Sequence, residues 1–290
     1  PFVYSTYVTG RNFIGRKAEC NTLGNLLGRG ENVVIYAPPK SGKRSLIQQA
    51  LFNMRVTGGQ FTACEVNLFN IRNAETFLIR LGSAVIRSCY STPAEYGNII
   101  SSLLEGTHFV FDKERFSRFD EVVSLNWSMD ENDIASMLRL PGRIAAERGT
   151  RMFIIINEFQ NLMEDERFET IFRLMKDVMM QHGNPETEGC SFILSGSKTN
   201  AMKYIFEEYK YFHKAVEHIP LQSIDSREIV EHVMRGFQNS GKVIEQDMIL
   251  DCCKVFKGNL WYINHYMAIC DSMTKGYINE GILMEAMRMM

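Results

Sequence analysis

The chain has 290 residues, of which 45% are hydrophobic and 23% are charged, and its net charge at pH 7 is −2. These values are ordinary for a globular protein with one large domain, or with a domain and a smaller one. Because the chain is nearly neutral, it has no overall electrostatic drive toward nucleic acid or an anionic membrane, and both are disfavoured as partners. The seven cysteines have no zinc-ligand spacing, no segment reaches the roughly 20 apolar residues of a membrane span, and the start lacks a signal-peptide pattern. We therefore expect a cytoplasmic protein with reduced thiols.

Strand and helix patterns alternate in the first part of the chain. Apolar residues on one face predict a helix over residues 17–27. The continuous apolar run NVVIYA is typical of a buried parallel strand, and helical spacing follows the segment SGKRS. Next come a second predicted strand, FTACEVNLF, and a long predicted helix, AETFLIRLGSAVIRSC.

Residues 91–130 are less regular, and we interpret them as an insertion with some helix. They contain an aromatic cluster without interleaved basic residues, which favours packing over base stacking: Phe109, Phe111, Phe116, Phe119 and Trp127. A helix is predicted over residues 130–148, with an acidic first turn and with Gly149 at its end.

Two further strands are predicted at RMFIIIN and CSFILSG, with an amphipathic helix between them, and a short last strand at VEHIPL. After Pro220 the patterns are those of four successive helices. The order predicts an α/β domain over residues 1–221, with a parallel sheet of about five strands, and a small helical domain over residues 222–290.

The segment IYAPPKSGKRSL lies between a predicted strand and a predicted helix, where a phosphate-binding loop would have G-x-x-x-x-G-K-[ST]. Gly42 and Lys43 match this Walker A pattern, whereas Ala37 replaces its first glycine and Arg44 its hydroxyl residue. Backbone N–H groups of the loop and of the helix start would form a nest for an anion. The alternative is an ordinary basic turn between a strand and a helix.

A second pattern, FIIINEFQNL, lies where P-loop enzymes have the Walker B strand. An acidic residue there holds magnesium through water, and a following glutamate polarises the attacking water. Here the strand ends in Asn157 and Glu158. The amide of Asn157 offers a carbonyl oxygen but no charge. Glu158 is the candidate water activator, with an exposed glutamate at a strand end as the alternative.

Taken together, five stretches in order resemble the archaeal-type ATPase family of P-loop NTPases, a relative of the AAA+ and STAND groups that is also common in gut Bacteroidetes. They are NFIGRKAECNTL, IYAPPKSGKRSLI, FIIINEFQNLM, FILSGSKTNAM and FKGNLWYINHYM, the last with Leu260 where the family has proline. The resemblance covers essentially the whole chain. It implies a three-layer P-loop sandwich, here over residues 1–221, followed by a helical lid.

The resemblance also implies roles for individual residues. Lys43 should contact the β and γ phosphates, Glu158 should be the catalytic carboxylate with Gln160 beside it, and Ser195 or Ser197 should be a polar sensor. The adenine side should be formed by Phe13 and Ile14 with Val8, although a simple packed N-terminal arm is an equal alternative. The expected phosphate-binding residues are Pro39, Lys40, Ser41, Gly42, Lys43, Arg44 and Ser45.

Both groups that normally hold magnesium are replaced, by Arg44 in the loop and by Asn157 at the strand end. Losing a carboxylate weakens the hold on a divalent ion, and the arginine adds positive charge. Ser45 is rotated by about 100° around the helix and is a poor substitute. We therefore assign no protein metal ligand and expect ATP or ADP to bind with a weakened requirement for Mg²⁺.

These substitutions leave the kind of activity open. One hypothesis is an ATPase with altered Walker residues and slow hydrolysis. The other is a non-hydrolysing, nucleotide-gated switch that acts on a protein partner, which the sequence does not specify. A third hypothesis, remodelling of nucleic acid, is supported only by analogy with other proteins of the same fold. The sequence leaves the oligomeric state open.

Overall fold

The computed structural model describes residues 1–112, 114–117 and 120–290. The chain forms two compact units. The first, which we call the loop unit, comprises residues 1–24, 37–57 and 220–290, and the second, the sheet unit, comprises residues 25–36 and 58–219. The division at residues 221 and 222 expected from the sequence stays a prediction.

A five-stranded parallel sheet organises the sheet unit, in the strand order β2-β5-β6-β1-β7. The strands are β1 Val33–Tyr36, β2 Phe61–Asn67, β5 Arg151–Asn157, β6 Cys190–Gly196 and β7 Glu217–His218. The interiors of β5 and β6 are buried, as their continuous apolar runs predict. Strands β1, β2 and β7 are shorter than their predicted runs. At β7, Pro220 has no N–H group to extend this edge strand.

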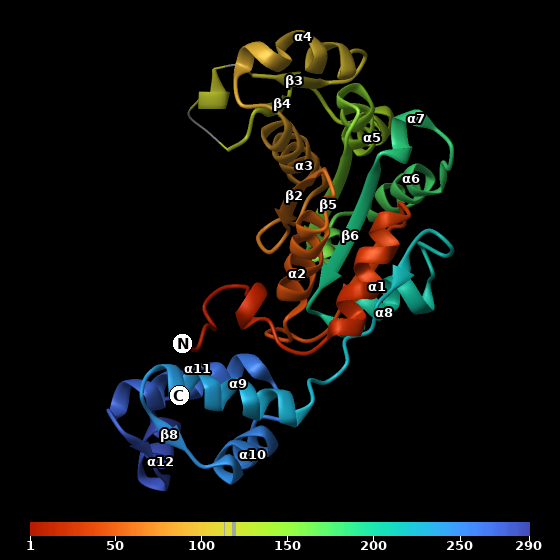
Figure 1. Cartoon of the computed structure of the whole chain (residues 1–290). Helices are drawn as coiled ribbons and strands as arrows, with labels where there is room; N and C mark the ends of the chain where they lie inside the picture. The colour runs from red at the N-terminus through yellow and green to blue at the C-terminus, as the bar shows by residue number, and fades with distance from the viewer. Residues whose placement is uncertain (113, 118–119) are drawn as a thin grey trace. The chain divides into compact units, whose positions relative to one another are not determined.

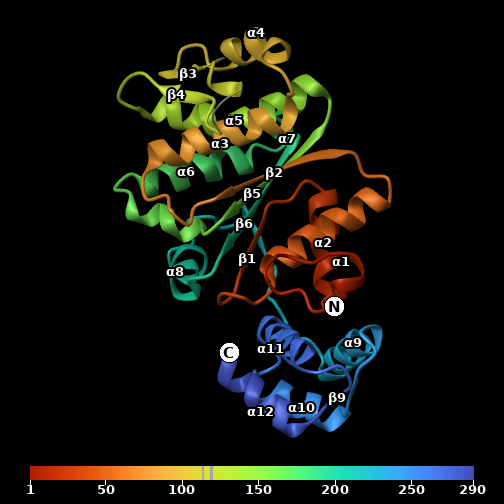
Figure 2. The same cartoon turned by 90° about the vertical axis from the view of Figure 1, so that its left-hand side faces the viewer.

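Three helices lie together on one side of this sheet in Figure 2, and Figure 1 shows the same elements turned by 90°. They are α3 Ala74–Cys89, α5 Glu131–Arg148 and α6 Phe168–Met180. The first two are close to their predicted bounds, and α6 is the amphipathic helix expected between β5 and β6. Fully buried aromatic rings contribute to the core of this unit: Phe77, Phe159, Phe172 and Phe212. Short segments complete the unit, namely the 3₁₀ helix Phe159–Glu164, α7 Pro185–Glu188, α8 Thr199–Lys203 and the π-helical turn Tyr204–Glu208.

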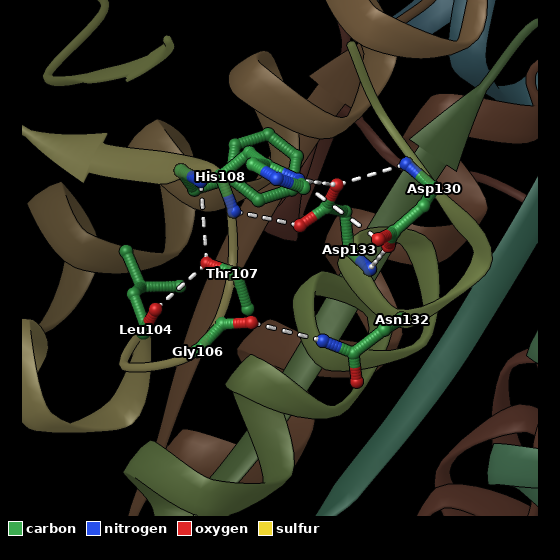
Figure 3. Close-up of polar contacts among 8 residues, drawn as sticks. Leu104, Gly106, Thr107, His108, Asp130, Asn132 and Asp133 are labelled. Carbon is green, nitrogen blue, oxygen red and sulfur yellow. Dashed lines mark hydrogen bonds and ion pairs between the residues drawn. The ribbon is translucent and has the colours of Figure 1, made fainter. Parts of the chain in front are cut away.

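The start of α5 is fixed by a network of hydrogen bonds around the buried carboxylate of Asp133 (Figure 3). This carboxylate accepts the backbone N–H of Asp130 at 2.9 Å, and Asp130 in turn accepts the N–H of Asp133 at 2.8 Å. His108 adds its backbone N–H and its ring Nδ1, each 2.8 Å from the same carboxylate. At the other end of α5, Gly149 adopts φ 60° and ends the helix as predicted.

The segment predicted as irregular holds more structure than the sequence indicates. It contains α4 Pro93–Leu103 and an antiparallel pair, β3 Phe109–Phe111 and β4 Val123–Leu125. Strands of three residues are too short for an alternating pattern to appear. Among the aromatic residues, Phe109 is buried, Phe111 and Phe116 pack against the core, and Phe119 lies outside the described residues. Trp127 is 73% exposed, so the packing interpretation is wrong for this residue.

The loop unit contains the helical C-terminal segment. Its helices are α9 Ser226–Asn239, α10 Gln246–Val255, α11 Leu260–Met273 and α12 Glu280–Met289, as the four patterns predict. Their core includes Phe2 from the start of the chain, whose ring lies 4.8 Å from that of Phe237. The expectation of helices alone was wrong, because β8 Val243–Ile244 and β9 Tyr277–Ile278 form a short parallel pair.

The same unit contains α2 Lys43–Val56, most of α1 Lys17–Gly28 and the 3₁₀ turn Gly10–Asn12. Across both units, none of the helices in the described part of the chain has the length and apolar character needed to cross a bilayer.

Candidate nucleotide-binding site

The loop between β1 and α2 has a backbone suited to holding an anion. Lys40 has φ 61° and Gly42 has φ 88°, both in the left-handed region. Left-handed residues in such a turn direct backbone N–H groups toward one point, and the start of the 14-residue α2 follows directly. The positive φ of Gly42 favours glycine, and a Cβ atom there would lie 2.7 Å from the Nη1 atom of Arg16 and would push that side chain away.

This loop borders a cavity of about 650 Å³ within the loop unit. The other walls come from residues 3–16, 221–224 and 257–264. Five lining residues carry a positive charge, and none of the described lining residues is Asp or Glu; the five are Arg16, Lys40, Lys43, Arg44 and Lys257. A cavity with this lining is complementary to a polyanion.

Three of these cations belong to the loop itself. The Nζ atom of Lys43 donates to the carbonyl oxygens of Ala37, at 2.8 Å, and Pro38, at 3.0 Å. The Nζ atom of Lys40 lies 3.5 Å from the centre of the Trp261 ring, and the Cζ atom of Arg44 lies 4.9 Å from that of Tyr7, both as cation–π contacts.

Arg16 is a functional candidate that the sequence analysis missed. Its Nη1 atom donates a short hydrogen bond to the carbonyl oxygen of Ser41, and its Nε atom donates to that of Gln222 at 3.2 Å. Burial lowers the pKa of the guanidinium and nearby Glu19 opposes this, but an arginine stays charged in a protein. The G-R pair in NFIGR was the available signal, since it precedes a helix and falls within the resemblance.

The N-terminal arm is tied to α2. The Oγ atom of Ser45 accepts the backbone N–H of Val8 at 3.1 Å, and the side chain of Gln49 accepts that of Gly10 at 2.7 Å. Ser45 is therefore engaged with the arm. Phe13 and Ile14 line the cavity and are half-buried, so the arm both packs against α2 and forms a wall of the cavity.

The other predicted catalytic residue, Glu158, belongs to the sheet unit. It follows β5 and has φ 56°, a conformation that is strained for a glutamate. Its Oε2 atom accepts hydrogen bonds from Gln160 Nε2 and from Ser197 Oγ, each at 2.7 Å. The carboxylate is thus held in place by two of the polar residues named from the sequence.

Asn157 joins three adjacent strands at their carboxyl ends. Its Nδ2 atom donates to the carboxylate of Glu65 on β2, and its Oδ1 atom accepts from Ser195 Oγ on β6 at 2.6 Å. The sequence analysis missed Glu65, which puts a carboxylate next to the position where the family's acidic residue is replaced. The signal was that Glu65 is the one charged residue in the FTACEVN strand.

The predicted residues thus fall into two groups. Six of the seven predicted loop residues line the cavity together with Phe13 and Ile14, whereas Pro39 does not. Pro39 has no N–H group and is exposed. Glu158, Gln160, Ser195 and Ser197 are held by hydrogen bonds within the sheet unit.

No protein-family model matches the chain, and no curated protein is detectably similar to it in sequence. Solved structures do match. A Walker-type ATPase of Pyrococcus abyssi has a TM-score of 0.66 at 13% identity, over 99% of this chain and 74% of its own.

Two ORC proteins of Aeropyrum pernix match in the same way. The ORC2 protein, solved as ADPNP–ADP complexes, has a TM-score of 0.63 at 15% identity, over 99% of this chain and 71% of its own. The ORC1 protein, solved in complex with DNA, has a TM-score of 0.61 at 10% identity, over 96% of this chain and 65% of its own. Identities this low show the fold alone. The chain therefore has the α/β fold of the Walker-type and ORC/Cdc6-like P-loop ATPases, a parallel sheet of five strands followed by a helical C-terminal region.

Proposed function

We propose that the protein binds ATP or ADP with the phosphates on residues 38–45. The observation that carries this proposal is the cavity of about 650 Å³, which has five cationic lining residues and no described carboxylate. The left-handed residues of the loop and the start of α2 add backbone donors. Membership of the archaeal-type ATPase family is part of the same proposal and rests on the five sequence stretches and the shared fold.

Magnesium has a smaller part in this proposal than in an intact P-loop site. The loop hydroxyl is replaced by Arg44, and Ser45 is engaged with Val8. The carbonyl oxygen of Asn157 accepts a hydrogen bond from Ser195, and its amide group donates one to Glu65. The cations of the cavity supply positive charge that a bound metal ion would otherwise contribute.

Hydrolysis, on this proposal, is slow and uses Glu158 to polarise the attacking water. The carboxylate is already oriented by Gln160 and Ser197, which is the arrangement that a positioned base requires. The weakened hold on magnesium limits the rate, because the metal normally neutralises the charge that develops on the transferred phosphate.

The assignment of the site is tested with Lys43→Ala. Lys43 is the loop cation expected at the β and γ phosphates, so the variant should show no measurable ATP or ADP binding by calorimetry. Lys17→Ala is the matched control, since Lys17 is exposed and does not line the cavity. If Lys43→Ala binds both nucleotides as tightly as the control does, the proposed site is wrong.

A nucleotide-gated switch is the second candidate function, with a protein partner as its output. Contacts within the loop unit favour it, because Lys40 reaches Trp261 of α11 and Arg16 reaches Gln222, just before α9. Phosphates would attract Lys40 away from the indole ring. In a Trp127→Phe variant, Trp261 is the remaining tryptophan, and its emission should then change when ATP binds.

Steady-state phosphate release separates the two candidates. A magnesium-stimulated turnover supports the ATPase, whereas a change in Trp261 emission without turnover supports the switch. DNA binding is a property of the ORC1 match, and with a net charge of −2 we do not propose it here. Salt-dependent retention of DNA by the protein would contradict that choice.

A further inference from the structure

Arg16 is held in an unusual backbone conformation that directs it toward the phosphate-binding loop. Gly15 and Arg16 are consecutive left-handed residues, with φ 65° and 53°. Gly15 cannot be replaced without a collision, because a Cβ atom there would lie 2.9 Å from Ile224 and 3.2 Å from Glu228. A non-glycine residue in this region is strained, and such strain is typical of functional positions.

The guanidinium lies against the loop. Its Nη1 atom contacts the Ser41 carbonyl oxygen and lies 2.7 Å from the position that a Cβ atom on Gly42 would take, so a side chain there would displace the guanidinium. Its Nε atom binds the carbonyl oxygen of Gln222. These two bonds use two of the five N–H donors of an arginine, and Arg16 lines the same cavity as Lys43.

A phosphate is a much stronger acceptor for a guanidinium than a neutral carbonyl oxygen is, because the hydrogen bond is then charge-assisted on both sides. We propose that Arg16 is a phosphate-binding residue of the nucleotide site, and that its bond to Gln222 couples occupancy of the loop to the segment that leads into α9. This inference rests on the proposed nucleotide binding and adds a residue and a route to it.

Calorimetry on three variants tests the first half. Arg16→Gln keeps polarity but removes the charge, and it should weaken ATP binding about ten- to hundredfold, as expected for a hydrogen bond to a charged group. AMP, with a single phosphate, should lose less. Arg16→Lys should recover part of the ATP affinity. Lys17→Gln, which removes the charge from the neighbouring exposed residue, should bind like the wild type.

Hydrogen exchange tests the second half. Saturating ATP should change the exchange of residues 221–225 in the wild type and in Lys17→Gln. In Arg16→Lys the change should be lost, because an ammonium group lacks the planar fork that contacts the loop and Gln222 together.

The outcomes are distinct. ATP binding by Arg16→Gln at wild-type affinity overturns the inference while leaving the proposed function intact. A second result also overturns it: Arg16→Gln loses affinity for ATP and AMP equally and melts at a lower temperature, and Arg16→Lys recovers no affinity. That result would show that Arg16 only stabilises the structure. A wild-type protein that binds neither ATP nor ADP contradicts the proposed function itself, and the inference falls with it.

Discussion

Gly42 illustrates how a single residue serves both the conformation of the loop and its contacts. Its φ of 88° disfavours any side chain, and Arg16 occupies the space that a Cβ atom would need. Replacing it by alanine should therefore destabilise the protein and displace Arg16 from the loop. We expect a loss of about 1–2 kcal/mol in the free energy of unfolding and at least tenfold weaker ATP binding.

Gly58→Ala is the matched control for this prediction. Gly58 has φ 90°, nearly the same as Gly42, but nothing lies within 4 Å of its Cβ position. Urea denaturation should show a comparable conformational cost, whereas calorimetry should show unchanged ATP binding. Equal losses of ATP affinity in the two variants would mean that the contact with Arg16 is irrelevant.

Asn157 is the residue at which a restored metal site can be tested. The change Asn157→Asp replaces an amide that donates to Glu65 with a like charge, so without metal it should lower the free energy of unfolding by about 1–3 kcal/mol. Paired with Arg44→Thr, it rebuilds both family residues. Magnesium should then raise the melting temperature of the double variant but not of the wild type. A double variant that is indifferent to magnesium would show that these two positions do not decide metal binding.

At the scale of single residues, the sequence predicted those that belong to a local motif. It missed those that matter through hydrogen bonds to other secondary-structure elements. Gly42, Lys43 and Glu158 are fixed by their spacing within a strand–loop or strand-end pattern. Arg16 and Glu65 are functional candidates because of hydrogen-bond partners far along the chain, Gln222 for Arg16 and Asn157 for Glu65. The sequence offered a local signal for each of these two residues, but a single sequence does not show which distant residues they contact.

At the scale of elements, the link between His108 and the start of α5 makes a prediction about pH. The hydrogen bond to Asp133 raises the pKa of the His108 ring above its ordinary value. Burial alone would raise the pKa of the Asp133 carboxyl, but the backbone N–H groups of Asp130 and His108 and the imidazole ring outweigh it, and the pKa is lowered. Asp130 also faces the ring, with its carboxylate 3.9 Å from Nδ1.

The sign follows from these directions. The stabilisation by charged His108 is fully present below the pKa of an unfolded histidine, about 6.5, and is lost as pH rises through the higher folded value. The stabilisation by the ionised Asp133 carboxylate is present above the pKa of an unfolded aspartate, about 3.9, and is lost as pH falls through the lower pKa of the folded state. Between these limits both contribute.

The variant His108→Gln isolates the histidine. Its melting temperature should lie furthest below that of the wild type near pH 5.5, and the two should converge by about pH 9, since neutral histidine and glutamine then differ little. A constant difference across this range would show that folding does not shift the pKa of the His108 ring.

The long elements were predictable and the short ones were not. Strands β5 and β6 are continuous apolar runs, and α5 has an acidic start and a glycine end, so local physics determines them. The pairs β3–β4 and β8–β9 have three and two residues per strand. Segments of that length form because tertiary contacts hold them, which a periodicity of two cannot reveal.

At the scale of the whole molecule, the net charge of −2 conceals a local concentration of positive charge. The five cations of the cavity come from residues 16, 40–44 and 257, which are distant in the chain. The order of five degraded motifs was enough to predict the fold. The composition of the cavity was not predictable, because it depends on how the N-terminal arm, the loop and residue 257 come together in the loop unit.

The most direct measurement of the central claim is the affinity for ATP with magnesium and with EDTA. If the cavity's own cations neutralise the phosphates, removing the metal should weaken ATP binding less than tenfold, which is less than about 1.4 kcal/mol. Calorimetry on the wild-type protein at one ionic strength gives both values, with ADP as a second ligand. A loss of tenfold or more in EDTA, together with rapid turnover that depends strictly on magnesium, would contradict the account and show that the metal is held as in an intact P-loop site.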